Sequence, residues 1–388
     1  MQPTLKSKLP NVGTTIFTVM SQLAHEHGAI NLSQGFPSFS PPAELTDMIG
    51  HYLKHGNNQY APMPGVLTLR EAIAEKTRRF QGRTVNAETE ITVCSGATEA
   101  LFSTIQAVVR RGDEVIVFDP AYDLYEPAIQ LAGGICRHVP LGLAAGSLDF
   151  IPDWQQLEES ISNKTRLIVC NFPHNPTGAI LDSTDLDRLA SLVRDTGILL
   201  LADEVYEHIV FDENTHTSLL SHEELWPRTF IVSSFGKTLH ATGWKIGYCI
   251  APAALSAELR RVHQFTVFAV NTPIQNALAE YLGSDPGFID SLASFYQQKR
   301  DLFCRLFQGS RFKLQPARST FFQLVDYADI SAEGDVDIAR RWTREIGVAS
   351  IPLSVFCATP TARRLLRFCF AKDDATLTDA VERLRALS

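Results

Sequence analysis

A lysine and a carboxylate follow two of the short apolar runs in this chain. Asp203 comes directly after the run at 198–202, and Lys237 comes four residues after the run at 230–233. A lysine amine can attack a carbonyl carbon to form a Schiff base, and a carboxylate can hold a positive charge on a nearby ring nitrogen. The two side chains suit covalent catalysis, provided that the fold brings them together.

Two further polar segments follow apolar runs in the same manner. The segment 95–99, Ser-Gly-Ala-Thr-Glu, opens a predicted helix whose free N–H groups can cradle a phosphate. The segment 175–178, Asn-Pro-Thr-Gly, is a turn sequence that presents a side-chain amide. Tyr206 adds a phenol three residues after Asp203.

Each of these features has an ordinary structural explanation when it is taken alone. Glycine-rich turns are common, an aspartate at a strand end can cap a helix, and a lysine after a strand usually lies at the surface. Their occurrence at corresponding positions of consecutive apolar runs favours a shared function, because unrelated surface residues would not follow the runs in this way.

The apolar runs themselves predict a mostly parallel β-sheet. They are short and rich in β-branched residues, and helical patterns separate several of them. The expected strands are 91–94, 114–118, 167–172, 198–202, 230–233 and 246–250. Continuous apolar strands that alternate with helices indicate a sheet covered on both faces, and ligands bind such sheets beyond the carboxyl ends of the strands. We therefore expect the polar segments to meet at one edge of the sheet.

The two ends of the chain predict a smaller α+β domain. After the sheet the expected order is helices over 254–308, a strand at 320–325, a helix at 336–346, a strand at 364–370 and a closing helix. The turn-rich segment 31–37 cannot be helical and is expected to pack against the C-terminal part or to line a cleft. The predicted fold is α/β, with a large domain at 45–265 and a small domain built from 1–44 and 266–388.

Composition excludes several classes of protein. The 388 residues are 45% apolar and 20% charged, which is typical of a globular chain and not of disorder or a disulfide scaffold. The net charge is −8, so we expect no nucleic-acid partner. No signal peptide or run of about 18 apolar residues is present, and the seven cysteines form no Cys-x-x-Cys pair, so we expect a cytoplasmic protein without a membrane contact.

The motifs together resemble those of fold-type I, class I/II aminotransferases, over nearly the full length of the chain. The matching segments, in order, are 175–178, 203–206, 233–237, 243–247 and 366–370. The resemblance implies a large domain with a mostly parallel sheet between helices, pyridoxal 5′-phosphate as cofactor, and transfer of an α-amino group to a 2-oxo acid through pyridoxamine phosphate.

The resemblance also implies the roles of the catalytic residues. Lys237 would hold the cofactor as a Schiff base and then move a proton between the substrate Cα and the cofactor. Asp203 would keep the pyridine nitrogen protonated, which makes the ring a strong electron sink. Tyr206 and Asn175 would hydrogen-bond the phenolic oxygen of the cofactor.

The remaining implied contacts hold the cofactor and the substrate. The phosphate would be bound by Gly96, Ala97, Thr98, Ser234 and Lys245. Tyr122 would stack on the cofactor ring, and Tyr60 would reach the phosphate of a partner subunit, which implies a homodimer with shared active sites. Arg367, selected by the family pattern over its neighbours 363 and 364, would grip the substrate α-carboxylate together with Asn175 and Gly35.

One departure from the general family pattern points to a subgroup. Lys245 stands where many members have arginine, and the kynurenine, glutamine and methionine aminotransferases resemble this chain there and at 31–37. Nothing resembles the second arginine that aspartate aminotransferases use for a dicarboxylate. We therefore expect methionine to be the favoured amino donor, followed by aromatic amino acids and glutamine.

Two other functions stay open on the sequence. A pyridoxal phosphate-dependent carbon–sulfur β-lyase would use the same motifs, and a ligand-sensing regulator could retain an aminotransferase-like domain. Such a regulator usually carries a DNA-binding module, for which the 44 residues before the predicted large domain leave little room. The histidine pairs 25/27 and 51/55 lack a third ligand at a recognisable spacing, so no metal site is expected.

Overall fold

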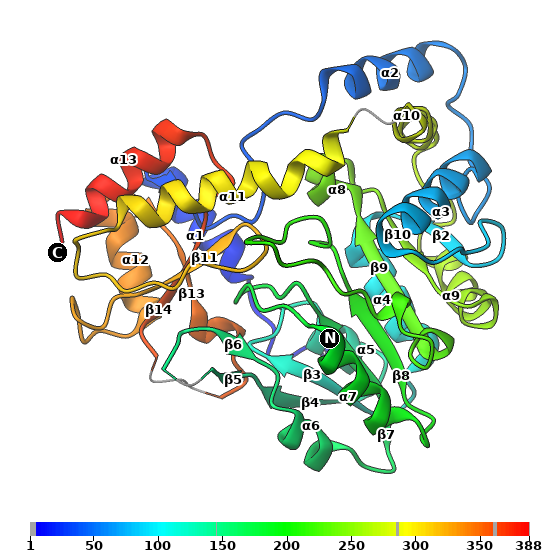
Figure 1. Ribbon diagram of the computed structural model, residues 1–388, viewed down its shortest axis with the longest axis horizontal. Coiled ribbons are helices and arrows are strands. Elements are labelled where there is room, and N and C mark those ends of the chain that lie inside the picture. The colour runs from blue at the N-terminus through cyan, green and yellow to red at the C-terminus, as the bar shows by residue number, and fades with distance from the viewer. Residues whose placement is uncertain (1–4, 145, 285–286, 360–362, 388) are drawn as a thin grey trace, which may run out of the picture.

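A seven-stranded sheet forms the centre of the computed structural model, which describes residues 5–144, 146–284, 287–359 and 363–387 (Figure 1). Its strands, in spatial order, are β2 (Ile91–Cys94), β10 (Gly247–Ile250), β9 (Thr229–Ser234), β8 (Leu199–Asp203), β7 (Thr165–Asn171), β3 (Glu114–Asp119) and β4 (Ile135–Pro140). All neighbouring strands are parallel except β10, which runs antiparallel to β2 and β9. The predicted mostly parallel sheet is confirmed.

Both faces of this sheet are buried, as the continuous apolar runs predict. Val115 and Val117 of β3 enter one apolar cluster, which also contains residues of α4 and α9. Ile116 and Phe118 of the same strand enter the second, larger cluster on the opposite face. The helices that follow or precede these strands are α3 (Leu67–Gln81), α4 (Gly96–Val108), α5 (Tyr125–Leu131), α6 (Trp154–Ser160), α7 (Ser183–Val193), α8 (Phe235–Thr238) and α9 (Ala253–Thr266).

The edge strand β4 was not predicted. Its residues alternate between exposed and partly buried positions up to Val139, so the segment lacks the continuous apolar run that identified the other six strands. An edge strand buries one side less than a central strand does, which weakens the signal in the sequence.

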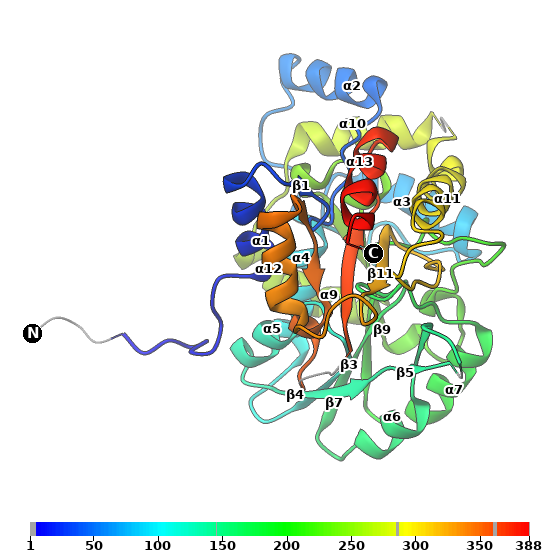
Figure 2. The ribbon, with the colours of Figure 1, turned by 90° about the vertical axis from the view of Figure 1, so that its left-hand side faces the viewer.

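A second layer of structure is assembled from both ends of the chain. Its three-stranded sheet has the order β11 (Phe322–Asp326), β14 (Leu365–Cys369) and β13 (Ile351–Pro352). The helices around it are α1 (Ile16–Glu26), α11 (Phe288–Leu306), α12 (Asp335–Glu345) and α13 (Asp374–Arg385). The short strand β1 (Ile30–Asn31) pairs with β12 (Val348–Ala349), and α1 lies beside α12 (Figure 2). The predicted packing of segment 31–37 against the C-terminal part is confirmed.

The remaining elements bear on the predicted domain boundaries. Helix α10 (Thr272–Gly283) packs against α2 (Ala43–Lys54), which crosses the predicted boundary at 44/45, and against α3 of the predicted large domain. This packing favours including α10 in the large domain, whereas the boundaries at 44/45 and 265/266 stay a prediction.

A small hairpin consists of β5 (Gly142–Leu143) and β6 (Phe150–Ile151), and single 3₁₀ turns lie at Leu219–Ser221, Trp226–Arg228, Thr242–Trp244 and Leu353–Phe356. Among the described residues, no helix is long and apolar enough to cross a bilayer.

Candidate active site

A cavity lies beyond the carboxyl ends of the parallel strands, where ten of the predicted site residues meet. These ten are Gly96, Ala97, Thr98, Tyr122, Asn175, Asp203, Tyr206, Ser234, Lys237 and Lys245. They come from the ends of five different strands and from the turn before the antiparallel strand β10. The topology of the sheet therefore gathers side chains that are up to about 150 positions apart in the sequence.

Lys237 projects from the short helix α8. Ser234 caps this helix, because its Oγ accepts a hydrogen bond of 3.1 Å from the Gly236 amide. The Lys237 amine donates to the Gly35 carbonyl at 2.7 Å and lies 5.6 Å from the centre of the Tyr206 ring. Burial of the amine lowers the pKa of Lys237 to about 8, so a much larger fraction is neutral and nucleophilic near neutral pH than for a free lysine.

Asp203 ends β8 with its carboxylate buried at 4% exposure. One oxygen, Oδ2, accepts a hydrogen bond of 2.6 Å from the Tyr125 phenol, and the other, Oδ1, is buried without a hydrogen-bond partner among the described residues. Burial raises the pKa of Asp203 to about 6, although the Tyr125 hydrogen bond opposes the shift. A buried carboxylate oxygen without a partner is costly, which marks Oδ1 as the contact for a cationic donor such as a protonated pyridine nitrogen.

The first turn of α4 supplies an anion site. Ser95 precedes the helix without a side-chain cap, so the amides of Ala97 and Thr98 have no acceptor within the helix. Lys245 lies over this turn and donates to Thr98 Oγ1 at 3.3 Å. A Cβ on Gly96, which has a φ of 75°, would lie 3.2 Å from Lys245 Cε, so glycine keeps the cradle open. Free amides, a hydroxyl and a cation are the donors that a phosphate requires.

Arg367 lies in the middle of β14 and is almost completely buried. Its guanidinium donates to Asn175 Oδ1 at 2.7 Å and to the Ser33 carbonyl at 3.1 Å. The ring centre of Phe322 is 3.9 Å from the guanidinium carbon, and two further phenyl rings stand at 5.2 and 5.3 Å. Burial lowers the pKa of Arg367 to about 10, so the side chain remains a cation at neutral pH and can bind a carboxylate.

The other predicted residues differ in their relation to the cavity. Gly35 contributes the carbonyl that accepts from Lys237, and a Cβ at this position would come within 2.8 Å of the Phe322 ring. Tyr122 lines the cavity, and burial raises its pKa to about 12. Tyr60 does not line the cavity: its side chain is 83% exposed and its ring packs edge-on against Phe268.

Sequence reasoning missed two residues that support the site. Tyr125 is the hydrogen-bond partner of Asp203, and Asn171 donates from Nδ2 to the Asp203 carbonyl at 3.2 Å. Asn171 Oδ1 also accepts from the Asn175 amide at 3.1 Å, so it links two of the predicted segments. Asn171 ends β7 opposite Asp203 in the sheet register, and a prediction of that register from the sequence would have found it.

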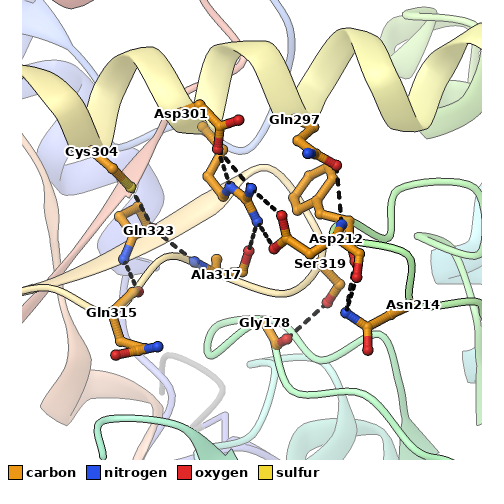
Figure 3. A network of polar contacts seen from close by, with 12 residues as sticks. Gly178, Asp212, Asn214, Gln297, Asp301, Cys304, Gln315, Ala317, Ser319 and Gln323 are labelled. Atoms are coloured by element: carbon orange, nitrogen blue, oxygen red, sulfur yellow. Dashed lines mark hydrogen bonds and ion pairs between the residues drawn. The ribbon is translucent and has the colours of Figure 1, made fainter.

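A polar network connects α11 with the loop before β11 and with the segments around Gly178 and Asp212 (Figure 3). Arg300 of α11 forms ion pairs with Asp212 and Asp301 and donates to the Ala317 carbonyl at 3.0 Å. Next to it, Ser319 Oγ donates to the Gly178 carbonyl at 2.9 Å, in the turn that carries Asn175. The network therefore fixes that turn against the small sheet.

One buried group of side chains has the composition of a metal site. Cys94, Glu99 and His263 bring three possible ligand atoms within 4.8 Å of one another. However, Glu99 accepts hydrogen bonds from His263, from Ser103 Oγ at 2.7 Å and from a backbone amide, and the second nitrogen of His263 faces a carbonyl oxygen. The group is explained by its hydrogen bonds, which tie the start of α4 to α9.

Comparisons with known proteins agree on one family. The profile described as "Aminotransferase class I and II" matches residues 27–384. A methionine aminotransferase of Escherichia coli (strain K12) is 50% identical over 382 residues, which are 98% of each chain. A kynurenine–oxoglutarate transaminase of Dictyostelium discoideum is 36% identical, covering 97% of this chain and 94% of the relative.

Solved structures show the same relationship. The crystal structure of YbdL from Escherichia coli, reported with a methionine aminotransferase function, superposes with a TM-score of 0.96 at 50% identity over 99% of this chain and 100% of the other. Aspartate aminotransferase from Thermus thermophilus with maleate superposes with a TM-score of 0.91 at 29% identity over the full length of both chains.

Proposed function

The chain belongs to the class I and II aminotransferases, and on that basis we propose that it transfers the α-amino group of methionine, and less readily of aromatic amino acids and glutamine, to a 2-oxo acid. Aminotransferases of this family depend on pyridoxal phosphate, and this chain is such an enzyme. The observation that supports the detailed proposal best is the cavity that joins the Lys237 amine, the unpartnered Asp203 oxygen and the α4 anion cradle.

The residues present fit the cofactor. The buried Oδ1 of Asp203 lacks a partner that a protonated pyridine nitrogen would supply, and the start of α4 offers free amides where a phosphate would bind. Tyr122 and Val205 also line the cavity, and they would offer an aromatic ring and an aliphatic side chain for contact with the cofactor ring. When bound, pyridoxal phosphate supplies an aldehyde for the amino group and an electron-withdrawing ring that stabilises charge at the substrate Cα.

Lys237 is proposed to act as nucleophile and then as base. Its lowered pKa, about 8, makes the neutral amine accessible near neutral pH, as both roles require. The amine is held by the Gly35 carbonyl, so it is oriented without being neutralised by a carboxylate. When the substrate amino group takes the place of the lysine amine at the cofactor aldehyde carbon, the freed amine would take the proton from the substrate Cα. It would then return that proton to the aldehyde carbon of the cofactor.

Arg367 and Asn175 are proposed to bind the substrate α-carboxylate. The guanidinium is fixed by the Asn175 amide oxygen and the Ser33 carbonyl, and its Nε is buried without a partner in the part of the chain that the structure describes. A bidentate carboxylate would satisfy a fork of this kind. This binding would place the substrate Cα over the cavity and within reach of Lys237.

The proposed preference for methionine rests on the relatives and on the cations of the cavity. The methionine aminotransferase of Escherichia coli shares half of its aligned residues with this chain. Among the described residues that line the cavity, the cations are Lys237 and Lys245, and the proposed roles occupy both. No cation of the described lining is then left for a second substrate carboxylate, which disfavours aspartate.

A homodimer is part of the proposal. Tyr60, Phe265 and Phe268 expose 83, 88 and 53% of their side chains, and exposed aromatic side chains of this kind are typical of protein interfaces. Tyr60 would then reach the phosphate site of the partner subunit. We also propose a cytoplasmic location, which the seven free cysteines favour, because disulfides are rare in reducing compartments.

A donor panel tests this function. The purified protein is incubated with a 2-oxo acid and with methionine, phenylalanine, glutamine or aspartate in turn, and the new amino acid is quantified. Methionine is expected to react fastest, with a change in the visible absorbance of the bound cofactor, and Lys237→Ala is expected to lower kcat by about a thousandfold or more. Faster turnover of aspartate would refute the preference, and release of thiol and pyruvate from cystathionine without an oxo acid would identify a β-lyase.

A further inference from the structure

Tyr125 combines burial with a direct contact to the carboxylate of the site. Its side chain is 2% exposed, and its phenol donates to Asp203 Oδ2 at 2.6 Å, the short distance expected for a hydroxyl and an ionised acceptor. The residue begins α5, and its amide donates to the Tyr122 carbonyl at 3.2 Å. The rings of Tyr122 and Tyr125 meet edge-on at 5.7 Å. One turn of the chain thus carries both the predicted stacking residue and the partner of Asp203.

The contact determines which carboxylate oxygen remains available. Oδ2 is taken by Tyr125, whereas Oδ1 is buried without a partner among the described residues. The backbone of Asp203 is fixed independently, because its carbonyl accepts from Asn171 Nδ2 and the strand pairs on both sides. Without the phenol, Oδ2 would lose its side-chain partner, and the carboxylate would be held less firmly in the orientation that aims Oδ1 at the cavity.

The contact also affects the ionisation of Asp203. Burial raises the pKa of this carboxyl to about 6. The hydrogen bond from Tyr125, the backbone amide of Val205 and the charge of Lys237 lower it, and the charge of Glu204 raises it. The phenols of Tyr122 and Tyr206 also face it, and both are neutral at the pH of interest because burial raises their pKa values. Loss of the Tyr125 hydroxyl therefore removes the hydrogen bond that most strongly favours the ionised carboxylate.

We propose that Tyr125 is a positioning residue of this enzyme, which presents Asp203 Oδ1 to the ring nitrogen of pyridoxal phosphate and keeps the carboxylate ionised. The inference rests on the proposed function and extends it to a residue that lies outside the cavity lining. Because the effect is on a titrating carboxylate, it must depend on pH. Removal of the hydroxyl weakens cofactor binding most on the acidic side, where Asp203 becomes protonated, and least on the alkaline side.

The test compares Tyr125→Phe with a matched control, Tyr327→Phe. Tyr327 is also fully buried, and its hydroxyl donates to the Glu333 carbonyl at 2.9 Å, within the small domain. Each change removes one buried hydroxyl and one hydrogen bond and leaves the ring in place. The dissociation constant of pyridoxal phosphate is measured by ultrafiltration of the diluted holoenzyme between about pH 5.5 and 8.5, and thermal unfolding is followed in parallel.

Tyr125→Phe is expected to weaken cofactor binding by about tenfold near pH 6, the effect of one hydrogen bond to a charged group, and to shift the acidic limb of the binding curve to higher pH. Tyr327→Phe is expected to lower thermal stability while its binding curve coincides with that of the wild type. A Tyr125→Phe curve that also coincides with the wild type, or that is displaced equally at every pH, would refute the inference and leave the function intact. A wild-type protein that neither binds the cofactor nor transaminates would refute both.

Discussion

The phenyl ring that covers Arg367 offers a direct test of how the carboxylate site is built. Phe322 lies 3.9 Å from the guanidinium carbon, whereas Phe17 and Phe356 stand at 5.3 and 5.2 Å. A cation over an aromatic face in a site without water is stabilised by about 1–2 kcal/mol, which corresponds to a factor of about 5 to 30 in a binding constant. Phe322→Leu removes the nearest ring and leaves both hydrogen bonds of Arg367 possible.

The expected result is a selective change in the Michaelis constant. The KM for methionine should rise about 5- to 30-fold while kcat falls much less, because the ring orients the carboxylate anchor and does not contact the atoms that react. The unfolding free energy should fall by about 1–2 kcal/mol, as for other truncations in a core. Steady-state kinetics and urea unfolding measure the two effects separately.

A matched variant separates the two effects. Phe312→Leu truncates a buried ring that packs against Phe307 and Trp342, away from the cavity. This control should lose comparable stability with an unchanged KM for methionine. If Phe322→Leu likewise kept the wild-type KM, stacking on Arg367 would have no role in substrate binding and the reasoning would be wrong.

Three further predictions concern the α4 anion site, the polar network around Arg300 and the buried histidine next to Asn175. Lys245→Met should weaken cofactor retention in dialysis by about tenfold and Lys245→Arg should not, since the cation over α4 is the feature that matters. Arg300→Met should lower the unfolding free energy in urea by about 1–3 kcal/mol with little change in kcat, because its partners Asp212, Asp301 and Ala317 do not line the cavity. Burial lowers the pKa of His174 to about 3, so below about pH 6.5 the unfolded chain binds a proton that the folded chain does not bind. The unfolding free energy therefore falls as the pH falls. His174→Asn should make this decline shallower in urea unfolding at acidic pH.

The sequence allowed prediction of the strands whose two faces are buried. Their continuous apolar runs, such as 167–172, are a strong local signal, and the rule that ligands bind beyond the carboxyl ends then places Asn175, Asp203 and Lys237 together. The edge strand β4 was not predicted because only Val139 in it is fully buried, and two polar residues, Arg137 and His138, interrupt its apolar residues. Local pattern was sufficient for the six strands with continuous apolar runs, including the buried edge strand β2, and insufficient for the partly exposed edge strand β4.

Tyr125 illustrates what local pattern cannot show. It lies 78 positions before Asp203, and nothing in its immediate sequence distinguishes it from a tyrosine of the core. The contact depends on where α5 starts and on how β3, β7 and β8 are ordered, which are properties of the assembled sheet. The same holds for Asn171, whose role follows from a register that pairs it with Asp203.

Cations that are removed from water need hydrogen-bond acceptors, and backbone carbonyls near the start of the chain supply them here. Arg367 and Lys372 are buried and Lys237 is partly buried in a chain of net charge −8, and desolvation lowers the pKa values of Lys237 and Arg367. The carbonyl of Gly35 accepts from Lys237, that of Ser33 from Arg367 and that of Phe36 from Lys372, at 2.7, 3.1 and 2.9 Å.

Backbone carbonyls stabilise these cations without adding a carboxylate that would compete with the substrate. A carboxylate at the same place would form an ion pair with Lys237 and raise the pKa of its amine. It would also compete with the substrate α-carboxylate for Arg367. The turn-rich segment around Gly35 is therefore better suited to the site than a helix would be, because a helix would direct its carbonyls into its own hydrogen bonds. This explains in physical terms why an extended segment from the start of the chain lies against a strand from its end.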